Sequence, residues 1–310
     1  MNLKVYIASF SLAILASACF TGIESTPKIT AGDLRREKVT GAETPEQQLA
    51  AMIRPQSPSE WKDGRRYLVT DSKIDLVFTG AATEQLPHPG DTLIFRALNP
   101  APSVMGQKAT LLRFSRTSAP ADTIDYKVEI TPENMAARTS FDIPFTIDLT
   151  LVSLADSMLR GRRLYTNTSY WYDSNLRQIT GRKFVPVTVD RVSAGNTDYP
   201  FRVEFTDEKG EKRCMLMSNS RAGASTRNFA ALFSLTDPKL RYPLITDENW
   251  AAITNGRVRK EMTREEARLA LGSPSDVAYG NDYSFSYERW VYPGGIFLIF
   301  EDGILKTFRQ

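Results

Sequence analysis

The chain has 310 residues, with 39 Lys and Arg against 36 Asp and Glu, and a formal net charge of +3. So small an excess of positive charge gives no reason to expect nucleic-acid binding. The content of 42% hydrophobic and 24% charged residues is that of an ordinary globular protein, which excludes a fully disordered chain. With two cysteines and one histidine in the whole sequence, no Cys/His spacing suits a metal, and we expect no cofactor.

The N-terminus has the pattern of a secretory signal. Lys4 supplies the positive charge, residues 5–16 are apolar, and Ala16-Ser17-Ala18 is a small-residue cleavage site. The apolar run is shorter than the roughly 20 residues that a membrane-spanning helix needs. We therefore predict that residues 1–18 are removed and that Cys19 becomes the first residue.

The segment Leu15-Ala16-Ser17-Ala18-Cys19 resembles a bacterial lipobox in the relaxed form of Bacteroidota lipoproteins. The resemblance implies a palmitate-type lipid on Cys19 and an outer-membrane anchor. An ordinary signal peptide cut at the same bond, leaving Cys19 unmodified, is the alternative. Lipidation would leave Cys214 unpaired and, within its apolar stretch, buried, whereas an unmodified Cys19 could form a disulfide with it.

Residues 19–41 are expected to form the lipidated cysteine and a tether, because residues 21–41 contain few large apolar side chains. Surface lipoproteins of the resembled group carry an acidic cluster after the cysteine, and only Glu24 lies near it here. We therefore expect a periplasm-facing position. A helix should follow, with Thr44 as N-cap, Pro45 at its first position and Gln47 closing a capping box. Its predicted inward residues are Leu49, Met52 and Ile53.

From residue 67 to 217 short alternating apolar runs, separated by Pro, Gly, Asn and Ser, predict mainly β structure. Gly64-Arg65-Arg66-Tyr67 and Gly161-Arg162-Arg163-Leu164-Tyr165 begin two similar stretches. We predict two β units, 42–145 and 146–240, each preceded by a helix. A duplicated SH3-like barrel and a coincidence of glycine-led strands both explain the similarity. The second helix should span 149–160, with Asp148 as N-cap and with inward residues Leu151, Val152, Ala155 and Leu159.

Residues 244–310 form the sharpest local pattern. Thr246 caps one predicted helix, and Thr263 with Glu266 forms a capping box for a second. Strands are predicted at 284–292, 296–300 and 304–308, with Asp302-Gly303 as a two-residue turn between the last two. The order is α, α, β, β, β, and the fold class of the whole chain is α+β.

This block resembles the SmpA/OmlA (BamE-like) lipoprotein domain. The residues that carry the resemblance are Met262-Thr263, Leu271-Gly272-Ser273-Pro274, Trp290-Val291-Tyr292 and Phe300-Glu301-Asp302-Gly303. The resemblance implies a two-layer α/β domain that binds other proteins or lipid at the outer membrane. It covers about a fifth of the chain.

Both alternating faces of residues 296–300 are apolar, so helices on one side of the sheet leave the other side uncovered. Either the preceding β region or a partner protein should cover that second face.

Three weaker signals concern binding or modification. Tyr165, Tyr170, Trp171 and Tyr172 form an aromatic cluster that could line a peptide or glycan groove, although strand aromatics are usually core residues. Trp250 with Arg257, Arg259 and Lys260 could meet anionic lipid head groups, although a solvated basic loop has the same composition. Asp122-Thr123-Ile124 resembles the Bacteroidota O-glycosylation triplet in a predicted loop, with Thr123 as acceptor.

Catalytic signals are few. His88 lies in a predicted turn, and the carboxylate pairs Asp71 with Asp75 and Asp207 with Glu208 have the context of exposed turns. The sequence therefore favours a non-catalytic, membrane-anchored scaffold with an envelope protein partner. The alternative is an envelope glycan- or peptidoglycan-binding protein or hydrolase with its site in the β region.

Overall fold

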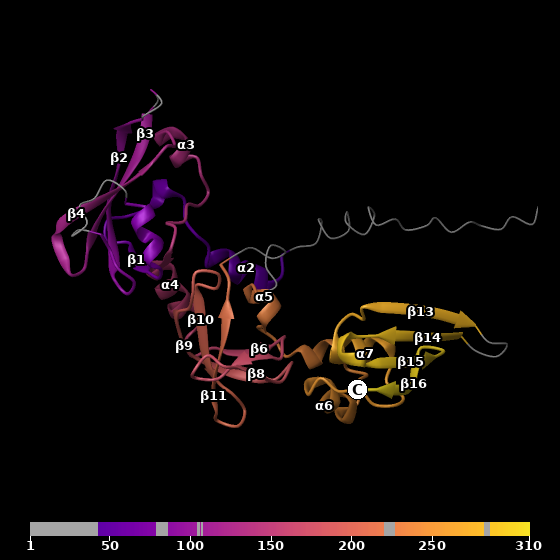
Figure 1. The fold of residues 1–310 in the computed structure, drawn as a ribbon. Coiled ribbons are helices and arrows are strands. Elements are labelled where there is room, and N and C mark those ends of the chain that lie inside the picture. Colours follow the sequence, from indigo (N-terminus) through magenta and orange to yellow (C-terminus); the bar gives the residue numbers. More distant parts are fainter. Residues whose placement is uncertain (1–42, 79–85, 104–105, 107, 220–226, 282–285) are drawn as a thin grey trace, which may run out of the picture. The chain divides into compact units, whose positions relative to one another are not determined.

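The computed structural model describes residues 43–310 except 79–85, 104–105, 107, 220–226 and 282–285 (Figure 1). The described part is an α+β fold with more strand than helix, and its strands form three antiparallel sheets. The predicted α+β class is confirmed. The predicted signal, Cys19 and the tether lie outside the described residues.

The first sheet has five strands in the order β4-β3-β2-β1-β5. It is preceded by helix α2 (Pro45–Met52) and the short 3-10 helix η1 (Pro58–Glu60), and helix α3 (Pro132–Ala136) comes before its last strand. The strands are β1 (Arg66–Val69), β2 (Thr92–Pro102), β3 (Lys108–Arg116), β4 (Ala119–Val128) and β5 (Thr146–Asp148). Because β5 pairs with β1, this sheet extends past residue 145.

Helix α2 begins as predicted, with the Thr44 and Gln47 capping box and Pro45 at its first position. Leu49 and Ile53 are buried, but Met52 is 62% exposed, so its predicted inward position is wrong. Met52 is the last residue of the helix, and the backbone leaves the helical conformation at Ile53, whose side chain is the one that reaches the core.

The core of the first sheet is aromatic. The Phe114 ring packs edge-on against Tyr67, Phe78 and Phe95, with ring centroids 5.9 to 6.0 Å apart. All four side chains are buried. Edge-to-face pairs of this kind add to the stabilisation that comes from burying the rings.

Helix α4 (Leu149–Leu159) leads into the second sheet. Its N-cap is Asp148, which accepts hydrogen bonds from the backbone N–H groups of Thr150 and Leu151 at 2.9 and 3.1 Å. The predicted inward residues Leu151, Val152, Ala155 and Leu159 are all buried, as expected from their helical spacing.

The second sheet has seven strands in the order β12-β6-β9-β10-β11-β7-β8. Helix α5 (Phe229–Leu232) comes directly before its last strand. The strands are β6 (Arg163–Thr166), β7 (Tyr170–Tyr172), β8 (Gln178–Thr180), β9 (Pro186–Ala194), β10 (Phe201–Thr206), β11 (Lys212–Met217) and β12 (Phe233–Ser234).

The first two sheets repeat one topology. When β6, β9, β10, β11 and β12 are matched in chain order to β1 to β5, their order in the sheet is the same. In both sheets the last strand of the series pairs antiparallel with the first and follows a short helix. The second sheet adds the hairpin β7–β8 at its far edge. The similar Gly-Arg-Arg segments thus introduce equivalent strands, β1 and β6.

The third sheet follows helices α6 (Asp247–Thr254) and α7 (Arg264–Leu271), whose predicted caps at Thr246 and Thr263 are confirmed. Four strands pair in chain order: β13 (Asp276–Asn281), β14 (Ser286–Val291), β15 (Phe297–Glu301) and β16 (Ile304–Arg309). The predicted α, α, β, β, β order is therefore wrong by one strand. Strand β13 lies at the sheet edge and contains no buried residue. An edge strand with no buried face needs no apolar alternation, and the sequence therefore gives no signal for it.

The final hairpin agrees with the sequence. Asp302 and Gly303 both have positive φ, 46° and 85°, which a two-residue type I′ turn requires. The inner face of this sheet packs Trp290 against Phe300 with ring centroids 4.7 Å apart, and both side chains are fully buried.

Candidate binding surfaces

The predicted aromatic cluster is not a single surface. Trp171 is buried, donates from Nε1 to the Thr168 carbonyl at 2.9 Å and packs edge-on against Phe205. Tyr170 is 60% exposed on the opposite side of the strand. Successive side chains of a strand point to opposite faces, and this separates neighbours that the sequence placed together. Trp171 is a core residue.

The other two tyrosines of the cluster have separate surroundings. The Tyr172 hydroxyl accepts a hydrogen bond from Arg227 at 2.8 Å. Tyr165 lies half-buried under the guanidinium of Arg163, 5.8 Å from the ring centroid. Neither ring adds to a groove with Trp171.

The predicted basic site near the C-terminal inter-helix turn is also not a single surface. Arg257, Arg259 and Lys260 are exposed, but Trp250 is buried and stacks on Phe184 with ring centroids 5.6 Å apart. Arg259 also pairs with Glu248 at 2.8 Å. The cations thus form a solvated loop without an aromatic anchor.

Strand β4 contains the residue predicted to be glycosylated. Thr123 is exposed and pairs with Ser115 of β3. The predicted loop is wrong, because Ala119, Pro120 and Ala121 before it belong to the edge strand β4. Edge strands tolerate proline where its missing N–H faces solvent.

The carboxylate pairs have structural roles. Asp71 caps the 3-10 helix η2 (Ser72–Leu76), and Asp207 accepts the N–H groups of Lys209 and Glu211 in the β10–β11 turn. Glu208 pairs with Arg182 at 2.6 Å. His88 is exposed in a turn, as predicted. Asp207 and Glu208 line a partly open cavity of about 130 Å³ together with Arg182 and Trp171, and both carboxylates already have partners there: the Lys209 and Glu211 N–H groups and Arg182.

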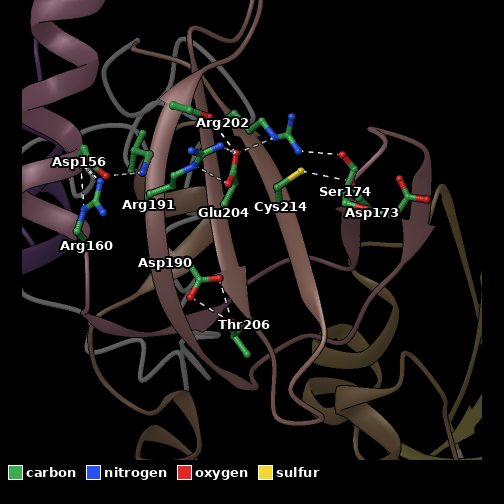
Figure 2. A network of polar contacts seen from close by, with 12 residues as sticks. Asp156, Arg160, Asp173, Ser174, Asp190, Arg191, Arg202, Glu204, Thr206 and Cys214 are labelled. Atoms are coloured by element: carbon green, nitrogen blue, oxygen red, sulfur yellow. Dashed lines mark hydrogen bonds and ion pairs between the residues drawn. The ribbon is translucent and has the colours of Figure 1, made fainter.

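A polar ladder crosses the outer face of the second sheet. Figure 2 shows Arg191, Glu204 and Cys214 in one row on β9, β10 and β11, as the strand register requires. Glu204 accepts hydrogen bonds from Arg191 Nε at 2.8 Å and from the Ser193 hydroxyl at 3.0 Å, and it forms an ion pair with Arg202 at 3.2 Å. With each charge of the row paired, the ladder stabilises the sheet face and offers no open ligand site.

Electrostatics within the ladder are consistent with this role. Partial burial acts to raise the pKa of Glu204, but the bonds from Arg191 and Ser193 outweigh it and hold the pKa below its usual value. Cys214 is buried as predicted, and its thiol donates to the Asp173 carbonyl at 3.6 Å. Burial raises the pKa of Cys214, so the thiol is protonated and unreactive at neutral pH.

Lys183 is a half-buried cation that the sequence analysis does not single out. Its ammonium donates to the carbonyl oxygens of Leu269 and Ala270 at 2.9 and 2.5 Å, at the C-terminal end of α7. Burial lowers its pKa. A cation at this end stabilises a helix because the last carbonyls are unpaired and carry partial negative charge. Only the fold brings residues so far apart in sequence into contact.

The outer face of the third sheet carries several apolar side chains that are only partly covered. Val291 and Phe297 are directly paired, and Ile299 lies two residues further along β15 on the same face. All three are half-buried, and Tyr287 beside them is 41% exposed. Gly280 allows the Tyr287 ring to lie across β13, because a Cβ there would come within 2.1 Å of the ring. The opposite face holds the buried Trp290, Leu298 and Phe300.

No protein-family model, curated protein or solved structure matches this chain. Among the described residues, no helix has the length and apolar character needed to span a membrane. Within the same residues, no group of three or more His, Cys, Asp or Glu side chains could hold a metal ion. The fold and its surfaces therefore define an α+β protein with two sheets of repeated topology and an apolar sheet face near the C-terminus.

Proposed function

We propose that this protein is a lipoprotein, anchored in the outer membrane through Cys19 and facing the periplasm, that acts as a non-catalytic scaffold for another envelope protein. The signal sequence and lipobox support the anchor. The half-exposed strip of Val291, Phe297 and Ile299 carries the interaction role, because contiguous apolar surface on a soluble domain marks a binding site.

The repeated topology supports two SH3-like units. In each, the first strand lies between the second strand and the last, and a short helix precedes that last strand. Five antiparallel strands in this order are typical of SH3-like barrels. The C-terminal helix caps and Asp-Gly hairpin support a BamE-like domain, with the additional edge strand β13 as a departure. Such small units serve as interaction modules more often than as enzymes, although fold alone does not establish function.

The apolar strip suits a protein partner. Arg289 and Arg309 flank it, and Arg309 lies over the Phe297 ring at 5.4 Å. An apolar centre with a polar rim containing arginine is the usual composition of a protein interface. A partner that covered Phe297 and Ile299 would remove this apolar area from water.

Site-specific crosslinking in living cells tests the scaffold role. A photo-crosslinking residue at Ile299 should yield a discrete adduct with an envelope protein, whereas the same residue at exposed Lys209 should not. Ile299→Asp should abolish co-purification of that protein without unfolding the chain. The absence of a specific adduct at Ile299 would exclude this surface as the interface.

The anchor is tested separately. Mass spectrometry of the native N-terminus should find a diacyl or triacyl Cys19, and Cys19→Ala should move the protein to the soluble fraction. An unmodified or disulfide-bonded Cys19 would contradict the lipid anchor. Identical partners for the unanchored variant would mean that the interface does not depend on the membrane location.

A further inference from the structure

A cavity of about 220 Å³ lies where β1, the segment 141–147 and the start of α4 meet. It is partly open to solvent, and the chain around the start of β10 also contributes to it through Thr197, Pro200 and Phe201. The rest of its lining includes Arg65, Tyr67, Phe141, Asp142, Phe145 and Asp148. None of the surfaces discussed above includes it. Its polar groups and its aromatic walls point to a ligand of particular chemistry.

Tyr67 provides the first of these groups. Its side chain is 98% removed from solvent, since only 2% of the residue is exposed. The ring packs against Trp61 and Phe114, while the hydroxyl is buried near the Arg65 guanidinium and makes no well-formed hydrogen bond within the described residues. A buried hydroxyl without a partner is unfavourable, so the cavity beside it should be occupied by something that bonds to it.

Arg65 is not available to a ligand. Its Nε donates to Asp148 at 3.0 Å, its Nη1 donates to Gln56 at 2.7 Å, and its Nη2 forms an ion pair with the same Asp148 carboxylate. The Arg65 and Asp148 charges therefore cancel. An anionic ligand would find no free cation among the described residues that line the cavity.

Asp142 leaves the cavity with an excess of negative charge. It makes no ion pair or hydrogen bond within the described residues that neutralises it, and desolvation together with the Asp148 carboxylate raises its pKa. Burial and the Asp148 carboxylate raise the pKa of Tyr67, and the Asp142 carboxylate adds to this rise. Asp142 and Tyr67 thus line a common cavity in which the one cation among the described residues, Arg65, is already paired with Asp148.

We propose that this cavity binds a primary alkylammonium group. The ammonium donates to the Asp142 carboxylate and to the Tyr67 hydroxyl oxygen, and the alkyl chain and charge lie against the Phe141 and Phe145 rings. Asp142 is itself exposed, so the ammonium would keep part of its hydration. A carboxylate, a hydroxyl acceptor and aromatic faces are the groups that stabilise a bound ammonium ion. The ligand can be a free amine or a lysine side chain of a peptide, and both present the same group.

Ligand-observed NMR and calorimetry on the full mature chain test the proposal. The probes are n-butylamine, neutral n-butanol and anionic butyrate, which share an alkyl chain but differ in charge. We expect n-butylamine to bind at least about tenfold more tightly than either of the others, because only it offers a charge-assisted hydrogen bond to Asp142. Equal binding of the amine and the alcohol would overturn the proposal.

Two conservative variants locate the site. Asp142→Asn should weaken amine binding by about tenfold or more, and Tyr67→Phe by several-fold, since each removes one acceptor and keeps the side-chain shape. Asp75→Asn, at an exposed position, is the matched control and should bind as the wild type does. Thermal unfolding of each variant establishes that it is folded. Amine binding that neither variant weakens, or no binding to the wild type, would mean that the cavity holds water only.

Blocked lysine distinguishes the two sources. Nα-acetyl-lysine methylamide mimics a lysine in a chain, and cadaverine mimics a free diamine. Tighter binding of the blocked lysine would assign the cavity to a peptide, and tighter binding of cadaverine to a small amine. If the blocked lysine, cadaverine and n-butylamine all fail to bind, the proposal is overturned. The crosslinking result at Ile299 does not depend on this outcome.

Discussion

Arg65 and Asp148 join the start of β1 to the start of α4. The guanidinium of Arg65 donates to the same Asp148 carboxylate that caps the helix through the N–H groups of Thr150 and Leu151. Only 6% of the Arg65 side chain and 19% of the Asp148 side chain are exposed. One carboxylate therefore satisfies a buried cation and two helix N–H groups at once.

Replacing Asp148 should strongly destabilise the protein. Asp148→Ala leaves a buried, uncompensated guanidinium and an uncapped helix, for an expected loss of about 3–5 kcal/mol in the free energy of unfolding. Asp148→Asn keeps the cap and should lose less. Urea unfolding measures both. Asp125→Ala, which breaks the more exposed pair with Arg113, is the control and should cost much less. A similar loss for Asp125→Ala and Asp148→Ala would contradict this role.

Gly181 should tolerate no side chain. A Cβ there would come within 2.0 Å of the buried Trp171 ring. Gly181→Ala should cost about 1–3 kcal/mol through overpacking of the second sheet, measured by thermal or urea unfolding. On a Trp171→Leu background the same substitution should cost less, because the ring that it meets is gone. Additive effects of the two substitutions would show that they do not interact.

Glu204 should make the free energy of unfolding depend on pH. Its pKa is lowered in the folded state, so its contribution is present above the unfolded value of 4.5 and is lost as pH falls through the lower folded pKa. Glu204→Gln should therefore cost on the order of 1 kcal/mol at neutral pH, and the gap to wild type should shrink below pH 4.5. Unfolding at pH 3 to 7 measures this. A gap that is constant across that range would exclude the titration.

Cys214 should react only when the second sheet opens. In a Cys19→Ser background it is the single thiol, and burial and a raised pKa both suppress its thiolate. Labelling by a thiol reagent at pH 8 should be at least about 100-fold slower in the native state than in urea, because reaction requires local opening. Fast native labelling would contradict the buried position.

Much of the local structure could be predicted. The helix starts at Thr44, Asp148 and Thr263 follow from side chains that bond to N–H groups two or three residues away. The Asp302-Gly303 turn follows from the backbone angles that these two residues tolerate. Such signals depend on close neighbours in the chain, so they survive without knowledge of the fold.

The predictions that the structure contradicts depend on contacts between residues far apart in the chain. Strand β13 has no buried residue and was not expected, and Tyr170 and Trp171 were grouped although a strand sends them to opposite faces. The neighbours of Thr123 favour turns and predict a loop, yet pairing with β3 makes this segment an edge strand. In each case pairing with a distant strand decided the outcome, and local preference did not.

The amino-acid sequence is enough to predict where the helices begin, that the middle of the chain is β structure, and that its start has the pattern of an export signal. Which side chains meet depends on the tertiary structure. Strand pairing aligns Arg191, Glu204 and Cys214, and packing brings Tyr67 and Asp142 to one cavity. The physical reason is that capping and turns involve neighbouring residues, whereas strand register and cavities depend on how segments far apart in the chain pack together.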